Sequence, residues 1–266
     1  MNVPPLTWLY VPADRPDRVE KAFASRAHAV IVDLEDGVAP AAKAEARSNL
    51  AALLGSPHEK PVYVRVNAGV AADLDAVATL AIDGVIVPKV AVPDDVPPCA
   101  HRVHCLIESA AGVEAAYEIA RTPGVAGISL GESDLRSETG ALEEGLDWAR
   151  GRIVNAAVAA RLPRPQQSVY PRLNDDEGLA RSCRRGRELG HLGRAAIHPE
   201  QLAVIERAYL PTEEEAARAR ATVDRLETAL GASTLAGGEF VDAAMLGAAR
   251  QLVALADRYG TAPGDG

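Results

Sequence analysis

Short apolar runs and amphipathic stretches alternate along most of this chain. Runs rich in valine and isoleucine predict strands that are buried on both faces of a parallel sheet, and the stretches between them predict helices. The predicted strands are residues 6–11, 29–34, 62–67, 84–87, 103–108, 127–131, 168–173 and 195–198. The predicted helices are residues 16–26, 40–54, 71–80, 112–121, 144–161, 176–189 and 199–209. Prolines within residues 93–98 make the remaining helical unit short or irregular.

Eight such units in about 210 residues predict an α/β fold of the (β/α)8 TIM-barrel type over residues 1–211. A doubly wound open sheet is the alternative, although no Gly-x-Gly-x-x-Gly follows the first strand, which disfavours its dinucleotide-binding form. Residues 212–266 predict a C-terminal helical arm. Its parts are a charged helix at 212–230, a small-residue linker at 231–238 and an amphipathic helix at 243–258.

Charged residues follow several of these strands directly. Glu108 and Asp134 come after the fifth and sixth strands, and Asp33, Glu35 and Asp36 cluster after the second. A charge at the end of a buried strand is too costly to serve as core filler. Because the carboxyl ends of parallel barrel strands form one mouth, these residues predict an active site there.

Glu108 and Asp134 predict a magnesium site, since two neighbouring carboxylates and water molecules suit a hard cation. The alternative is that each carboxylate caps a separate helix. The acidic cluster would add negative charge that a cation makes tolerable. Its members could instead cap the next helix or pair with Lys43 or Arg47. We expect both kinds of role within the cluster: some members cap the helix or form ion pairs, and Glu35 or Asp36 holds metal-bound water.

Basic residues supply candidate substrate contacts. Arg65 lies between two valines and therefore points away from them, into the mouth, where its fork could bind a carboxylate. A structural ion pair with the acidic cluster is the alternative. Lys89 is a second candidate cation, although lysines at strand ends often reach solvent. A third set, on the first helix, is either a solvated face or a phosphate-binding group. That set is Arg15, Arg18 and Lys21.

Composition narrows the classes of function. The 266-residue chain is 48% hydrophobic, so it can bury a large core, and its formal charge of −9 argues against nucleic acid as the main partner. Three scattered cysteines predict neither a disulfide framework nor a Cys-x-x-Cys metal site. No leader or apolar run of transmembrane length is visible, so we expect a cytoplasmic protein without a membrane partner.

Seven motifs occur in an order that resembles the citrate lyase β-subunit-like branch of the HpcH/HpaI aldolase superfamily. They are Leu9-Tyr-Val-Pro-Ala-Asp-Arg-Pro-Asp-Arg18, Val32-Asp-Leu-Glu-Asp-Gly-Val38, Val64-Arg-Val-Asn67, Val87-Pro-Lys89, Leu106-Ile-Glu-Ser109 with Gly112-Val113, Gly131-Glu-Ser-Asp-Leu135 and Ile197-His-Pro-Glu-Gln201. Each motif is weak alone, but seven in order make the resemblance specific, and it covers roughly residues 6–247.

The resemblance implies a Mg²⁺-binding barrel, usually a homotrimer, that makes or breaks carbon–carbon bonds between a 2-oxo acid and an acyl-CoA. Glu108 and Asp134 fall on the metal ligands, and Glu35 and Asp36 on the pair that holds metal waters. Arg65 falls on the arginine that binds the carboxylate of the oxo acid. The basic first helix falls where such enzymes receive coenzyme A. The implied reaction is cleavage of a short 3-hydroxy-3-carboxyacyl-CoA thioester into a 2-oxo acid and an acyl-CoA.

Two positions depart from the family pattern. Gly-Ala-Asn or Gly-Ala-Glu usually precedes the metal-binding aspartate, whereas this chain has Gly131-Glu132-Ser133. The family's arm usually reads Met-Ile-Asp or Met-Val-Asp and supplies its aspartate to a neighbouring subunit, but this chain ends that motif in Gly247. Loss of a proton-transfer group costs roughly 10²–10⁴-fold in rate. The alternatives are therefore a non-catalytic protein that binds acyl-CoA or a 2-oxo acid, and a thioester hydrolase.

Overall fold

A parallel sheet of seven strands forms the centre of the larger part of the molecule. The computed structural model describes residues 3–228, 233–235 and 238–262. The sheet order is β6-β5-β4-β3-β2-β1-β7, and each ladder between these strands is parallel. The strands are β1 (Thr7–Pro12), β2 (Ala29–Asp33), β3 (Val62–Arg65), β4 (Gly84–Val87), β5 (Val103–Ile107), β6 (Val125–Leu130) and β7 (Arg194–Ala196).

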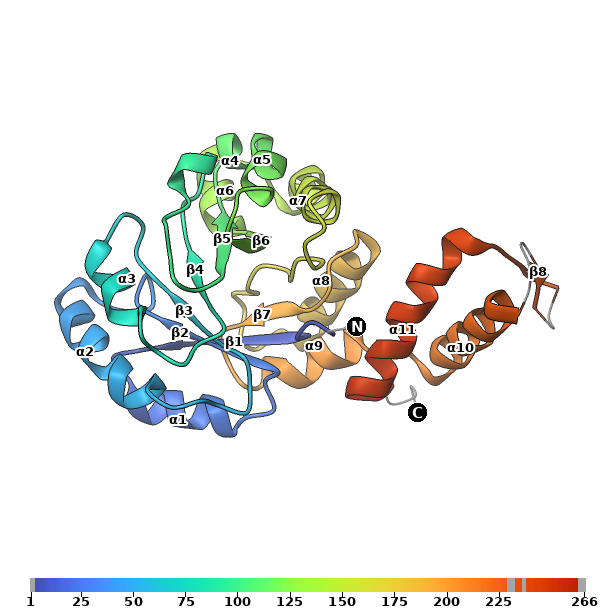
Figure 1. The fold of residues 1–266 in the computed structure, drawn as a ribbon, viewed down its shortest axis with the longest axis horizontal. Coiled ribbons are helices and arrows are strands. Elements are labelled where there is room, and N and C mark those ends of the chain that lie inside the picture. The colour runs from blue at the N-terminus through green and yellow to red at the C-terminus, as the bar shows by residue number, and fades with distance from the viewer. Residues whose placement is uncertain (1–2, 229–232, 236–237, 263–266) are drawn as a thin grey trace. The chain divides into compact units, whose positions relative to one another are not determined.

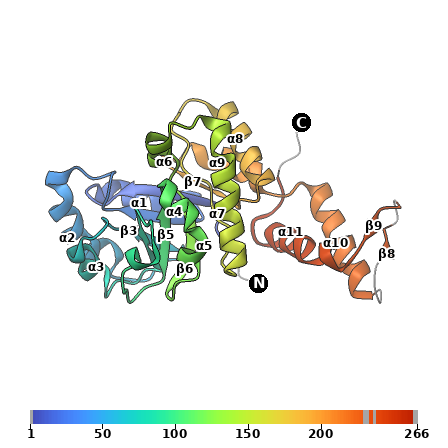
Figure 2. The ribbon, with the colours of Figure 1, turned by 90° about the horizontal axis from the view of Figure 1, so that it is seen from above.

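Helices connect these strands and lie around the outside of the sheet (Figures 1 and 2). They are α1 (Pro16–Ala24), α2 (Lys43–Leu54), α3 (Ala71–Val77), α4 (Ala110–Glu114), α5 (Ala116–Ala120), α6 (Glu132–Thr139), α7 (Asp147–Ala159), α8 (Asp176–Glu188) and α9 (Gln201–Tyr209). Short 3-10 turns at Pro40–Ala42, Pro93–Asp95 and Glu143–Leu146 complete the connections. The expected parallel α/β fold is confirmed, and residues 93–98 are irregular as predicted.

The sheet is curled, and side chains on its inner face meet across it. Trp8 on β1 and His104 on β5 have ring centroids 5.9 Å apart. Those strands are four places apart in the sheet, about 19 Å if it were flat. The curl closes this distance and gathers an inner core of Trp8, Ala29, Ile31, Ile86, Leu106 and Ala195. It also brings the carboxyl ends of the strands around one space.

The strand predicted at residues 168–173 is wrong. In that region Gln167 makes a single isolated bridge to Arg194, and no ladder joins β6 to β7 in the part of the chain that the structure describes. Pro165, just before this segment, and Pro171, within it, have no N–H to donate to a ladder, which limits pairing here. The predicted closed ring of eight strands is therefore observed as a curled sheet of seven.

Helix α6 is the second difference from the predicted elements. It occupies residues that we left between the sixth strand and the next helix, and it ends at Gly140, whose φ of 70° lies in the left-handed region. A glycine there ends a helix without steric cost. This short helix matters because it carries Asp134, one of the two predicted metal ligands.

The chain divides into two compact units, residues 5–205 and residues 206–266 with 1–4. In the second unit α10 (Glu213–Thr228) packs on α11 (Leu246–Tyr259). A short antiparallel pair, β8 (Ser233–Thr234) and β9 (Phe240–Val241), lies between them in sequence. Residues 231, 232, 236 and 237 of the predicted linker, and residues 229–230 of the predicted helix, lie outside the described residues. The predicted domains, 1–211 and 212–266, stay a prediction.

All three cysteines are free, as the absence of a disulfide pattern predicted. Among the described residues, no helix combines the length and the apolar character that crossing a bilayer would require.

The buried His104 should make the protein sensitive to acid. Burial lowers its pKa to about 4, below the usual value near 6.5. Between these pH values the unfolded chain takes up a proton at His104 and the folded chain does not, so stability falls as the pH drops. We expect His104→Gln to reduce the loss of unfolding free energy between pH 7 and pH 5 by about 2 kcal/mol. Urea unfolding at both pH values measures this.

The control is His198→Gln, because the His198 side chain is 43% exposed. Its pH dependence should follow that of the wild type. An equal fall in all three proteins would contradict the assignment of acid sensitivity to His104.

Candidate active site

A cavity of about 420 Å³ lies at the carboxyl ends of the strands. Four of the residues predicted for the site line it: Asp36, Arg65, Glu108 and Asp134. They come from the ends of β2, β3 and β5 and from α6, so the curl of the sheet brings distant parts of the sequence together. The location is the one where parallel α/β folds place their active sites.

Glu108 follows β5, and its carboxylate is held at the base of α6. Its Oε1 accepts a hydrogen bond from the Lys89 N–H at 2.8 Å. Its Oε2 occupies the space that a Cβ atom on Gly131 would need. Only a glycine at residue 131 therefore allows the Glu108 side chain to take this position. Burial, followed by the charges of Asp134 and Glu35, raises the pKa of Glu108 to about 7.

Glu108 and Asp134 fit a magnesium ion by their chemistry. Each offers carboxylate oxygen. The raised pKa of Glu108 reflects burial first and then the neighbouring charges of Asp134 and Glu35, and a bound cation would offset those charges. Within residues 3–228, 233–235 and 238–262, no three His, Cys, Asp or Glu side chains are grouped closely enough to hold a metal ion. With two protein carboxylates as ligands, water and substrate would fill the other coordination positions, which is the common arrangement for Mg²⁺ in proteins.

Arg65 on β3 combines the two roles that its sequence position left open. It makes a bidentate contact with Asp33, from Nε to Oδ1 at 2.7 Å and from Nη2 to Oδ2 at 2.6 Å, and its Nη1 lies 2.9 Å from Oε2 of Glu35. The guanidinium also lies 4.8 Å from the centre of the Tyr10 ring. The ion pair with the acidic cluster therefore forms, yet Arg65 still lines the cavity.

The three acids after β2 have separate environments. Asp33 accepts hydrogen bonds from the N–H groups of Glu35 at 3.0 Å and Gly37 at 2.8 Å, so it fixes the turn that carries the other two. Glu35 is buried, and burial raises the pKa of its carboxyl group although Arg65 opposes the shift. Asp36 is exposed and lines the cavity. Asp36 is thus better placed than Glu35 to reach solvent-borne ligands.

Lys89 joins two of the acids. Its φ of 59° is unusual for a residue other than glycine and lets the backbone N–H reach Glu108. Its Nζ lies 3.2 Å from Oε1 of Glu35, a contact that raises the pKa of the ammonium group. The structure places Lys89 as a support of the site carboxylates, and its predicted contact with substrate stays a prediction.

The basic residues of α1 lie outside the lining of this cavity as the structure describes it. Arg15, Arg18 and Lys21 are all exposed. Arg15 lies 3.7 Å from Asp14 and Lys21 lies 3.5 Å from Asp17, and such exposed pairs contribute little to stability. They are free to meet a large anionic ligand.

Sequence reasoning missed Tyr10, Gln166 and Arg150. Tyr10 lines the cavity beneath Arg65, and burial raises the pKa of its hydroxyl group. Its place on β1, two residues after the buried Trp8, was the available signal. Gln166 also lines the cavity and lies two residues before the segment that was wrongly predicted as a strand. Arg150 binds Glu132, one of the residues at which this chain departs from the family pattern.

Comparison with known proteins agrees with this geometry. Residues 6–100 and 99–199 match the model of the HpcH/HpaI aldolase/citrate lyase family. A citrate lyase subunit beta-like protein of Mycobacterium tuberculosis is 36% identical over 90% of this chain and 91% of its own. Two proteins of Cereibacter sphaeroides each match 94% of this chain and 93% of their own length. They are a (3S)-malyl-CoA thioesterase at 33% identity and an L-malyl-CoA/beta-methylmalyl-CoA lyase at 30%.

The fold also matches a solved structure closely. The CitE protein of Mycobacterium tuberculosis, in complex with magnesium, acetoacetate and coenzyme A, has a TM-score of 0.81. It is 33% identical, and the match covers 96% of this chain and 99% of that one.

Proposed function

The chain belongs to the HpcH/HpaI aldolase/citrate lyase family, and on that premise we propose that it is a Mg²⁺-dependent carbon–carbon lyase. Its substrate is a short 3-hydroxy-3-carboxyacyl-CoA thioester, which it cleaves to a 2-oxo acid and an acyl-CoA. The observation that carries this proposal is one cavity lined by Glu108, Asp134 and Arg65. The magnesium, oxo acid and coenzyme A present in the CitE structure support the same assignment.

Glu108 and Asp134 would hold the Mg²⁺, with Asp36 and Glu35 binding its water molecules. When bound, the cation supplies Lewis-acid polarisation of the substrate's oxygen atoms. The Lys89 N–H keeps Oε1 of Glu108 engaged and so fixes the direction of the carboxylate. Arg65 and Lys89 each contact one carboxylate oxygen of Glu35, which fixes the position of that acid.

Arg65 would bind the substrate's carboxylate. A guanidinium has five N–H donors, and the bidentate contact with Asp33 engages two of them. The contacts with Asp33 and Glu35 and the Tyr10 ring fix the plane of the fork, so the donors that remain for a substrate are preorganised. In the cleavage, the carbinol hydroxyl loses its proton and becomes the carbonyl of the 2-oxo acid as the bond between the carbinol carbon and the carbon next to the thioester breaks. The electron pair of that bond leaves as the thioester enolate, which takes up a proton to give the acyl-CoA, so one proton is released and one is consumed.

Arg15, Arg18 and Lys21 are proposed to receive the phosphates of coenzyme A. The arm is proposed to close the site of a neighbouring subunit in a homotrimer, where a proton donor is expected. Gly247 stands at the position that the family pattern gives to that acid. A cytoplasmic location completes the proposal.

A thioester hydrolase is the second candidate, and the 33% identical (3S)-malyl-CoA thioesterase favours it. Loss of the arm's acid would slow protonation of the thioester enolate and leave hydrolysis as the competing outcome. Binding without turnover is the remaining alternative.

Products distinguish these activities. Single-turnover reactions with malyl-CoA and citramalyl-CoA, with and without EDTA, should release a 2-oxo acid and an acyl-CoA only when metal is available. Free coenzyme A and the intact hydroxy acid would instead identify a hydrolase. Thermal stabilisation by a 2-oxo acid and Mg²⁺ without either set of products would identify a binding protein and contradict the proposed lyase.

A further inference from the structure

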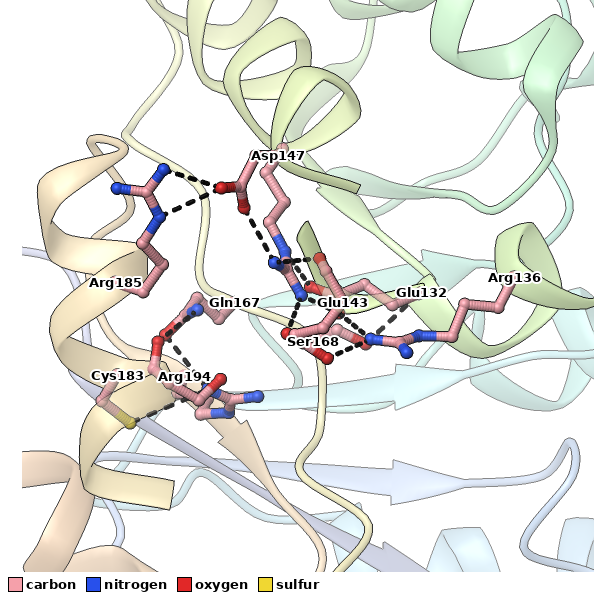
Figure 3. A network of polar contacts seen from close by, with 11 residues as sticks. Glu132, Arg136, Glu143, Asp147, Gln167, Ser168, Cys183, Arg185 and Arg194 are labelled. Atoms are coloured by element: carbon pink, nitrogen blue, oxygen red, sulfur yellow. Dashed lines mark hydrogen bonds and ion pairs between the residues drawn. The ribbon is translucent and has the colours of Figure 1, made fainter. Parts of the chain in front are cut away.

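A buried ion pair joins Arg150 to Glu132, which lies close to the proposed metal ligand Asp134 in the sequence of α6. Figure 3 shows Glu132 within its network of polar contacts. Glu132 is the first residue of α6, is 8% exposed and lines the cavity. Arg150 on α7 binds both of its carboxylate oxygens, from Nε to Oε1 at 3.0 Å and from Nη2 to Oε2 at 2.6 Å. Such a two-point contact fixes the direction as well as the position of a carboxylate.

Arg150 is itself held from several elements. Its side chain is 3% exposed, and its Nη1 donates to Oδ1 of Asp147 at 2.9 Å and to the Glu143 carbonyl at 3.1 Å. Its Nη2 also contacts Oε1 of Glu143 at 2.6 Å. Asp147 is bound in turn by Arg185 on α8 at 2.7 Å (Figure 3). These contacts fix the position of the Arg150 guanidinium, and the guanidinium in turn fixes the carboxylate of Glu132.

Asp134 depends on α6 for its position. It lies in the same first turn as Glu132, is exposed, and its carboxylate makes no hydrogen bond or ion pair within the described part of the chain. The helix has only 8 residues, and no side chain caps its N-terminus. Two hydrogen bonds from backbone N–H groups also hold this turn: the Glu132 N–H donates to Ser168 Oγ at 3.4 Å, and the Gly131 N–H donates to the Ile107 carbonyl at 2.8 Å. The bidentate contact with Arg150 is the one that fixes the Glu132 side chain in the turn that presents Asp134.

We propose that Arg150, acting through Glu132, is a positioning residue for the metal ligand Asp134. The inference rests on the magnesium site proposed above. Mg²⁺ tolerates little departure from octahedral geometry, so a first turn that moves by even about 1 Å would weaken its binding. The pair also neutralises Glu132, which would otherwise add a third negative charge close to Glu108 and Asp134.

Calorimetric titration of the full-length protein with Mg²⁺ tests this inference. In Glu132→Ala, Arg150 keeps Glu143 and Asp147 as partners, so no buried charge is left alone. We expect Mg²⁺ affinity to fall about fivefold to twentyfold. The fall in kcat should be larger than any change in KM for the thioester. Arg150→Lys keeps the positive charge but not the two-point guanidinium contact, so it should lose less Mg²⁺ affinity than Glu132→Ala. Arg181→Met, which removes an exposed arginine paired with Glu177, is the matched control and should bind as the wild type.

Melting temperatures separate a positioning role from general destabilisation. A purely structural role would lower the melting temperature but would leave the Mg²⁺ affinity unchanged at temperatures where the variant is folded. Wild-type affinity in folded Glu132→Ala would overturn the inference. If the alanine variant does not fold, Glu132→Gln provides the test, because glutamine keeps one acceptor for Arg150. This variant should show a smaller but measurable loss of Mg²⁺ affinity. Unchanged affinity in Glu132→Gln would also overturn the inference. Undiminished binding by Asp134→Asn would instead contradict the metal site itself.

Discussion

The Asp134→Asn protein should bind Mg²⁺ at least a hundredfold more weakly than the wild type, a loss of about 2.7 kcal/mol in calorimetric titration. The substitution keeps the size of the side chain but removes one of the two cavity-lining carboxylates that are proposed to bind the metal. Asparagine offers only a neutral oxygen, which is a weaker ligand for a hard cation. Thioester cleavage at limiting Mg²⁺ should fall in parallel and recover in part at high Mg²⁺.

Asp75→Asn provides the matched control, because it makes the same change of charge on the exposed face of α3 and away from the cavity lining. The Asp134 variant should also show a lower pKa for Glu108, since the Asp134 charge is the largest cause of its shift after burial. Equal Mg²⁺ binding by the Asp134 variant and the control would show that Asp134 is not a ligand.

The Gly247→Asp protein should cleave its thioester substrate tenfold or more faster than the wild type, a reduction of about 1.4 kcal/mol in the barrier. Gly247 is exposed in the first turn of α11, and an ideal Cβ there would meet nothing within 4 Å. An aspartate at this end of a helix is also favoured by the helix dipole, so folding should not suffer. The nearby Asp242 caps the Ala244 N–H at 3.0 Å and is already engaged.

Mg²⁺ affinity should not change in Gly247→Asp, because the new acid would act on proton transfer. Gly247→Asn is the control, since it adds the same volume without an acid and should leave the rate low. The gain also requires the proposed trimer, which light scattering measures. A monomer, or no rate change in a folded aspartate variant, would remove this role for the arm.

The sequence predicted the site better than it predicted the contacts within it. Charges at strand ends placed Asp36, Arg65, Glu108 and Asp134 at one mouth, because parallel strands share a carboxyl edge. The bidentate contact of Arg65 with Asp33 depends on register, since these two residues are direct partners across β2 and β3. Alternation along a single strand does not determine register with its neighbour.

Long-range and backbone effects account for the other gaps. The support that Lys89 gives to Glu108 depends on a left-handed backbone at a lysine, which no local pattern indicates. Helix α6 was not predicted, so Arg150 had no visible partner eighteen residues away. The segment at 168–173 has strand-like residues, but Pro171 within it cannot donate to a ladder, and only an isolated bridge forms just before it.

The most direct test is a crystal structure of this protein with Mg²⁺ and a 2-oxo acid. One ion should lie about 2.0–2.1 Å from carboxylate oxygens of both Glu108 and Asp134, with water completing its octahedron. The carboxylate of the oxo acid should lie within hydrogen-bond distance of Arg65. A metal bound elsewhere, or an oxo acid held without contact to Arg65, would contradict the proposed active site.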